Sequence, residues 1–259
     1  SDVYMQPILF NGSGTWATNG VVICNAADNQ SGPGIIADGT GGAYVGWTDN
    51  RNVTHTDLYL QRVNASGTAL WNANGLAVGS GAGYQAYSTM ALDPAGGVLT
   101  AWADSRNGTY HLYAQRLTSS GSALWGTNGL NVIAGASNQT NVQLASDNTG
   151  GAVISWDDDR NNAFAWDTFV IRVSAGGNLL WTSTGTQLSA STGLSHANQG
   201  VIPDGSGGAI VCWLEDAYNT PDVMAQRLNS SGTIQWGSGG ALISGAAMIM
   251  VAVFAGFAM

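Results

Sequence analysis

The sequence predicts an all-β fold, a five-bladed β-propeller with four antiparallel strands in each blade of about 55 residues. The first observation behind this prediction is a repeat, because two series of tryptophans recur about every 55 residues. The second is composition: 37 of the 259 residues are glycine, and Asn, Ser and Thr separate short apolar runs. No window combines a long period of 3.6 residues with caps at both ends, so we expect almost no helix.

The strands of one copy can be assigned in order. The first strand is the apolar run before an Asp-Gly turn, such as Gly34–Ala37, and the second follows paired glycines, as in Ala152–Trp156. The third is of the Asp57–Val63 type, and the fourth carries a Leu-Trp pair, as at Leu70–Trp71. Four antiparallel strands in each repeat are typical of a propeller blade. The two series are Trp16, Trp71, Trp125, Trp181 and Trp236, and Trp47, Trp102, Trp156 and Trp213.

The second strand of each copy has no polar face. Ala43, Val45 and Trp47 alternate with Tyr44 and Gly46, so both sides of this strand are apolar or small. A sheet covered on both faces by neighbouring sheets requires such a strand. We therefore expect the small residues of one slot to be core positions, which makes Cys212 a core residue. That slot holds Gly46, Ala101, Ser155 and Cys212.

The two ends of the chain are partial copies. We expect one propeller domain over residues 1–259, with full copies at 25–79, 80–134, 135–190 and 191–244 and partial copies at 1–24 and 245–259. The first residues match a third strand, and the apolar run from Met250 to Gly256 lies where a first strand belongs. Joined, they give a fifth blade without its second strand. Three explanations stay open: a fragment of a longer protein, an irregular fifth blade, or a strand donated by another subunit.

A set of motifs recurs in the same order in each copy. It reads Asp-Gly-x-Gly-Gly-Ala, then Trp-x-Asp-x-Arg, then Asp-x-Tyr-x-Gln-Arg, then Ser-Gly-x-x-Leu-Trp, and the last copy departs from it at Asp216-Ala217. This pattern resembles the β-propeller repeats of secreted and cell-surface bacterial proteins. The resemblance implies an extracellular or cell-surface location and a binding or scaffolding role. It supplies no catalytic residue.

The charges narrow the range of partners. Sixteen acidic residues face seven basic ones, all of them arginine, for a net charge of −9. Nucleic acid is disfavoured because its phosphates require a basic surface. The 15 uncharged residues from Gly245 onward are fewer than the roughly 20 that a membrane-spanning helix needs, so we expect no span. Cys24 and Cys212 do not have the spacing of a metal site.

Repeated carboxylates form the first candidate site. Each lies two residues after a tryptophan of the second series, and three of them are followed two residues later by an arginine: Asp49, Asp104, Asp158 and Glu215, with Arg51, Arg106 and Arg160. They are either a ring of ligand-binding groups or structural partners of arginines that recur because every blade needs them. The structural interpretation is favoured, since one active site needs unlike groups that converge once.

Two further candidate sites are polar. Side chains just before the first strands could bind sugars or could satisfy backbone groups near the tunnel mouth: Gln30, Gln85, Gln139 and His196. The run from Asp157 to Asn161 places three oxygen ligands at alternate positions, Asp157, Asp159 and Asn161, which suits calcium. Calcium is the one cofactor that the sequence suggests, although the glycine and distal glutamate of an EF-hand are absent.

These observations predict a non-catalytic extracellular scaffold or protein-interaction module, not an enzyme. Its expected partners are other copies of itself or surface proteins, with self-assembly into a surface layer or filament by strand complementation. The alternative is a carbohydrate-binding, lectin-like propeller. The third hypothesis is a glycoside hydrolase, which requires a pair of carboxylates across the sugar. The chain has a single glutamate and no unique acidic pair outside the repeat.

Overall fold

The computed structural model describes residues 1–189, 193–216 and 221–244. These residues form strands and turns and no helix, so the all-β prediction is confirmed for them. Every pairing between neighbouring strands is antiparallel. The predicted run from Met250 to Gly256 lies outside the described residues.

Each predicted full copy holds one four-stranded sheet, in which strands adjacent in the chain are adjacent in the sheet. Sheet 1 consists of β3 (Gln30–Ala37), β4 (Ala43–Asp49), β5 (Asp57–Val63) and β6 (Leu76–Gly79). Sheet 2 consists of β7 (Gln85–Leu92), β8 (Val98–Asp104), β9 (His111–Leu117) and β10 (Leu130–Asn131). Sheet 3 consists of β11 (Gln139–Ser146), β12 (Ala152–Asn162), β13 (Ala165–Val173) and β14 (Thr186–Gln187). Sheet 4 consists of β15 (Ala197–Pro203), β16 (Ala209–Glu215), β17 (Asp222–Leu228) and β18 (Ala241–Ser244).

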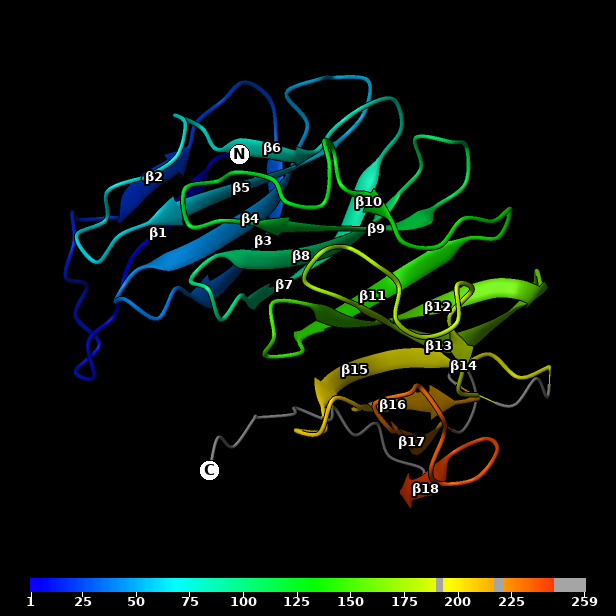
Figure 1. The fold of residues 1–259 in the computed structure, drawn as a ribbon. Helices are drawn as coiled ribbons and strands as arrows, with labels where there is room; N and C mark the ends of the chain where they lie inside the picture. Colours follow the sequence, from blue (N-terminus) through cyan, green and yellow to red (C-terminus); the bar gives the residue numbers. More distant parts are fainter. Residues whose placement is uncertain (190–192, 217–220, 245–259) are drawn as a thin grey trace.

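A two-stranded sheet of β1 (Val3–Met5) and β2 (Val21–Cys24) precedes these four. The sheets follow one another along an arc that begins at β1 and β2 and ends at sheet 4 (Figure 1). The first strands β3, β7, β11 and β15 pack against each other in sequence order along this arc. This is the arrangement of consecutive blades in a propeller-like fold.

The second strands form the core of each sheet, as predicted. Trp47, Trp102, Trp156 and Trp213 are each 0% exposed. A β-carbon added to Gly46 would lie 3.1 Å from the Met90 sulfur of sheet 2. The neighbouring sheet therefore packs directly on this position, which explains why only small residues occupy the slot. Cys212, in the same slot, is a free and buried cysteine.

The prediction for the fourth strand is wrong. Leu70 and Trp71 lie in the connection between β5 and β6, and β6 begins only at Leu76. The cause is the glutamine of the Gln-Arg motif. Gln61 accepts a hydrogen bond from the backbone N–H of Trp71 at 2.9 Å and donates one to the Asn72 carbonyl at 2.8 Å. These bonds hold the connection across β5, and Gln115 and Gln226 repeat them.

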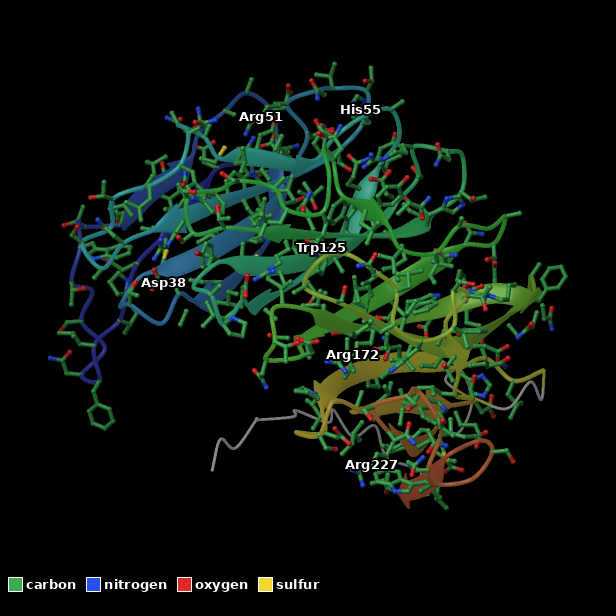
Figure 2. All side chains as sticks on the ribbon, viewed as in Figure 1. Asp38, Arg51, His55, Trp125, Arg172 and Arg227 are labelled. Carbon is green, nitrogen blue, oxygen red and sulfur yellow. The ribbon has the colours of Figure 1, made fainter. Side chains whose placement is uncertain are left out.

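Arginines at one end of the sheets join consecutive sheets. Arg62 binds Asp38 of its own sheet at 2.8 Å and donates to the Ser119 carbonyl of sheet 2 at 3.3 Å. Arg172 binds Asp147 at 2.8 Å and donates to the Gly207 carbonyl of sheet 4 at 2.8 Å. Figure 2 shows Asp38 at this end of sheet 1, whereas Arg51 and His55 lie at the opposite end. No helix among the described residues is long and apolar enough to span a membrane.

Candidate functional site

In three sheets, the tryptophan and the arginine of the Trp-x-Asp-x-Arg motif both bind the aspartate between them. In sheet 1 the Trp47 indole donates to Asp49 at 2.9 Å, and Arg51 donates to the same carboxylate at 2.6 Å. The Arg51 guanidinium also stacks over the Tyr59 ring at 3.8 Å. Burial by itself raises the pKa of Asp49, but the bonds from Arg51 and Trp47 outweigh it and hold this pKa below its usual range. Arg51 therefore neutralises the charge of the Asp49 carboxylate, and Trp47 and Arg51 occupy its hydrogen-bond acceptors.

Three of the four carboxylates in the predicted ring form an ion pair with the arginine of their own motif. Asp104 with Arg106 and Asp158 with Arg160 repeat the arrangement of Asp49, and all three aspartates are 0% exposed. A ligand-binding role for these three residues stays a prediction. The structure gives their oxygens partners inside the protein.

The predicted amides are buried too. Gln30 donates to the Ala27 carbonyl at 3.2 Å, Gln85 donates to Asp104 at 3.2 Å, and Gln139 accepts from the Leu112 N–H at 2.6 Å. None of the three is more than 4% exposed. Sugar binding by these amides stays a prediction. In the structure they form hydrogen bonds with neighbouring polar groups of the protein.

Sheet 4 breaks the pattern. Glu215 occupies the aspartate slot, Ala217 follows where the other copies have arginine, and the Trp213 indole N–H has no hydrogen-bond partner among the described residues. The Glu215 side chain is 26% exposed, whereas the aspartates of the other sheets are fully buried. Its Oε1 lies 3.8 Å from Nε2 of His196, which replaces the glutamine of the other copies.

His196 lies between two carboxylates. Its Nδ1 donates to the Trp166 carbonyl at 3.0 Å and lies 3.4 Å from Asp167 Oδ1. Its Nε2 faces Glu215 and has no hydrogen-bond partner among the described residues. Burial by itself lowers the pKa of His196, but the bonds to Asp167 and Trp166 and the charge of Glu215 raise it above its usual value. This histidine is therefore protonated more readily than an exposed one.

Asp157 is a buried carboxyl group near His196, and it has no arginine partner in its own motif. It accepts hydrogen bonds from the Asn141 side chain and from the Asn198 backbone N–H, both at 2.8 Å. Its residue exposure is 5%. Burial outweighs these bonds and raises the pKa of Asp157 to about 7. A carboxyl that is partly protonated at neutral pH is characteristic of acid–base sites.

His196 and Asp157 line one cavity between sheets 3 and 4, which we call the His196 pocket, and Glu215 lies next to His196. The pocket has a volume of about 290 Å³ and is lined by Thr140, Asn141, Asp157, Trp166, His196 and Ala197. Asn141 and Asn198 join the two sheets beside it, since each donates its side-chain amide to the other's backbone carbonyl, at 2.7 and 3.1 Å. The volume is at the lower end of the range for small-molecule sites, about 300 to 1,000 Å³.

The run predicted to bind calcium belongs to strand β12. Asp157 lines the His196 pocket, while Asp159 and Asn161 line a more open hollow of about 610 Å³ beside residues 134–138. Asp159 accepts two hydrogen bonds from Asn138, and Asn161 donates to Asp167. The described residues contain no group of three or more His, Cys, Asp or Glu side chains that could hold a metal ion. Calcium binding at Asp157, Asp159 and Asn161 stays a prediction.

The structure therefore unites His196, Glu215 and Asp157, which come from three different predicted sets. It adds Asn141, Asn198 and Trp166, which sequence reasoning did not assign to any site. One signal was present for Trp166, because it is the only tryptophan outside both series. Among the pocket residues, His196 departs most clearly from the repeat, because the other three copies have glutamine there.

No protein-family model matches the chain, and no curated protein sequence matches it. Among solved structures, a polysaccharide lyase, an ulvan lyase bound to -[GlcA(1-4)Rha3S]-, aligns with a TM-score of 0.56 and 9% identity over 79% of this chain. The alignment spans 57% of the lyase chain. A protein of unknown function from Dyadobacter fermentans aligns with a TM-score of 0.54 and 12% identity over 83% of this chain and 70% of that chain. An endo-arabinase from Bacteroides thetaiotaomicron has a TM-score of 0.49 and 10% identity over 83% and 81% of the two chains.

These comparisons correct two predictions. The prediction of a non-catalytic scaffold that self-assembles into a surface layer or filament is wrong, and so is the exclusion of an enzyme. The scaffold was inferred from the resemblance and from the incomplete fifth blade, and the enzyme was excluded because the sequence has a single glutamate and no unique acidic pair outside the repeat. The ulvan lyase shows that this fold can carry an enzyme acting on a polysaccharide. Carbohydrate recognition, the alternative hypothesis, is better supported.

Proposed function

We propose that this protein recognises a carbohydrate in the His196 pocket. The observation that carries the proposal is the convergence there of unlike groups outside the repeat. Asn141 comes from β11, Asp157 from β12, Trp166 from β13, and His196 directly precedes β15. A binding site needs such a combination of different groups once in the molecule, whereas packing residues recur in every copy.

The chemistry of the pocket fits a sugar. Amide and carboxyl groups can accept from and donate to hydroxyl groups, and Trp166 adds an aromatic residue to the lining. A pocket of about 290 Å³ suits one sugar unit of a longer chain. The likeness of the fold to a saccharide-bound polysaccharide lyase supports the proposal without fixing the sugar.

Binding to a glycan array, followed by calorimetry on the best glycan, tests this proposal. We expect Trp166→Ala and His196→Gln each to weaken binding at least about tenfold, which corresponds to roughly 1.4 kcal/mol. His196→Gln installs the residue that the other three copies carry. Phe10→Ala, at an exposed aromatic residue outside the pocket, is the matched control and should leave the affinity unchanged. Equal affinities of all variants, or no binding by any glycan, would refute the proposal.

Cleavage of a glycosidic bond is the second candidate function. It is favoured by Asp157, whose raised pKa of about 7 leaves a proton available for a departing sugar oxygen at neutral pH. Glu215 provides a second carboxyl beside His196. We expect Asp157→Asn to keep glycan binding within about threefold and to abolish the release of new reducing ends. Reducing ends released equally by the variant and the parent would remove this candidate.

We also propose five blades and an extracellular location. The support for the blade count is that β1 and β2 pair as a third and fourth strand do. Val3 pairs with Cys24 before a register shift, just as Leu58 pairs with Gly79 in sheet 1. The resemblance of the repeat to secreted and cell-surface propellers supports the location. A crystal structure tests the blade count, and fractionation of the native host with an antibody tests the location.

A further inference from the structure

We infer that the glycan recognised by the His196 pocket carries no negative charge, so that its units are neutral or amino sugars rather than uronates or sulfated sugars. This inference rests on the proposed function. It is based on the positively charged side chains of the protein and on the ion-pair partner of each of them.

Every cationic side chain that is always charged is already neutralised inside the protein. The sequence contains seven arginines and no lysine, and each arginine forms an ion pair with one aspartate. The aspartate side chains in these pairs are at most 3% exposed. Proteins bind carboxylate and sulfate groups mainly through arginine or lysine. This chain has no such residue without an aspartate partner.

Three acidic side chains lie at or next to the pocket. The sequence has sixteen acidic residues and seven arginines, which gives the net charge of −9. Asp167 is 3.4 Å and Glu215 is 3.8 Å from His196, and Asp157 lines the pocket with it. The field in the pocket is therefore neutral to negative.

His196 does not offer a free positive charge either. Its Nδ1 is directed at the Trp166 carbonyl and at Asp167, and its Nε2 faces Glu215. When this ring is protonated, two carboxylates already balance its charge. A uronate or sulfate that entered the pocket would lie near the carboxyl groups of Asp157 and Glu215 without a compensating cation, and like charges in a partly buried site repel strongly.

The experiment uses the full chain on an array with neutral, amino, uronate and sulfated glycans, and then a charge-altered derivative of the best binder. We expect the best binders to be neutral or amino glycans, and oxidation of a C6 hydroxyl to a carboxylate to weaken binding at least about tenfold. A best binder of the uronate or sulfated class, which loses affinity on carboxyl reduction or desulfation, overturns the inference while the proposed function survives. Absence of binding by every class overturns both.

A pair of variants tests whether the pocket itself imposes this selectivity. Glu215→Gln and Asp28→Asn each remove one negative charge, but Asp28 is an exposed residue that does not line the pocket. We expect Glu215→Gln to raise the affinity for the oxidised glycan about threefold or more relative to its neutral parent, since it removes one close like charge. Asp28→Asn should leave this ratio unchanged. An equal effect of the two variants would show that net charge, and not the pocket, excludes acidic sugars.

Discussion

Asp104 shows how completely one side chain can be fixed by its repeat motif. Its carboxylate accepts from the Trp102 indole at 2.9 Å, from the Arg106 backbone N–H at 3.0 Å and from the Arg106 guanidinium at 2.9 Å. Gln85 adds a bond at 3.2 Å. An amide in this place would turn one acceptor into a donor among donors and would leave the Arg106 charge without its partner.

We therefore expect Asp104→Asn to lower the free energy of unfolding by about 3 kcal/mol. Urea denaturation of the variant and the parent measures this difference. Asp2→Asn removes the same charge at an exposed residue and should change stability by less than about 0.5 kcal/mol. Equal losses in the two variants would mean that net charge, rather than the buried ion pair, determines the effect.

The pocket residues show what sequence reasoning could reach at this scale and what it could not. Asp157, His196 and Glu215 were each recognisable as polar residues at notable positions, but they belonged to separate sets. Their union depends on the placement of the start of β15 against β12 and β16. Asn141 was not recognisable at all, because its role comes from a left-handed backbone conformation (φ 48°) that aims its amide at Asp157 and at the Asn198 carbonyl.

At the scale of elements, the arginine that follows the motif glutamine decides how firmly one sheet holds the next. Arg172 is 14% exposed and bridges Asp147 of sheet 3 and the Gly207 carbonyl of sheet 4. Arg227 is 42% exposed, and its bonds to Asp204 and Ser206 stay within sheet 4. The two residues lie on the last two sheets of the arc (Figure 2).

This difference predicts unequal losses for the same substitution. Arg172→Ala should lower the free energy of unfolding by about 3 kcal/mol, because it leaves a buried carboxylate and a carbonyl at the sheet boundary without their donor. Arg227→Ala should lower it less, by about 1 kcal/mol, because the Arg227 guanidinium is already partly exposed to water and makes no bond to another sheet. Urea midpoints with unchanged slopes are the measurement. A loss in Arg227→Ala as large as that in Arg172→Ala would show that contact between sheets is not the cause.

Element boundaries show where patterns mislead. The Leu-Trp pair was expected in a strand because its spacing is regular, yet a side-chain bond from Gln61 holds Trp71 in a connection. The run from Asp157 to Asn161, singled out for its oxygen ligands at alternate positions, belongs to strand β12, which continues to Asn162. A regular spacing shows that a contact recurs and does not show which kind of contact it is.

For the whole molecule, the repeat was sufficient to predict stacked four-stranded sheets, because packing recurs with every copy. It was insufficient to predict the pocket, because the pocket exists only where two non-identical copies meet. The Trp213 indole without a hydrogen-bond partner among the described residues marks this place. The stability that sheets 1, 2 and 3 gain from the Trp-x-Asp-x-Arg unit is missing in sheet 4, and the Glu215 carboxylate, which occupies the aspartate slot there, lies 3.8 Å from His196. The candidate site in this molecule therefore lies where the repeat is broken.

The stability of the whole molecule should have its maximum at mildly acidic pH. Burial raises the pKa of Asp104, Asp147 and Asp204, but hydrogen bonds and arginines outweigh it and lower all three, that of Asp204 to about 2. Their contributions to the free energy of unfolding are present above the unfolded pKa of about 3.9 and are lost as pH falls below it.

Asp157, with its pKa raised by burial to about 7, has the opposite effect on stability. Its contribution to the free energy of unfolding is fully present below about pH 3.9, and up to roughly 4 kcal/mol is lost as pH rises towards 7. Urea midpoints between pH 3 and 8 should therefore peak near pH 4 to 5, and Asp157→Asn should flatten the decline above the peak while leaving the acid side unchanged. A decline above the peak that persists in Asp157→Asn would mean that another group, such as His196, causes it.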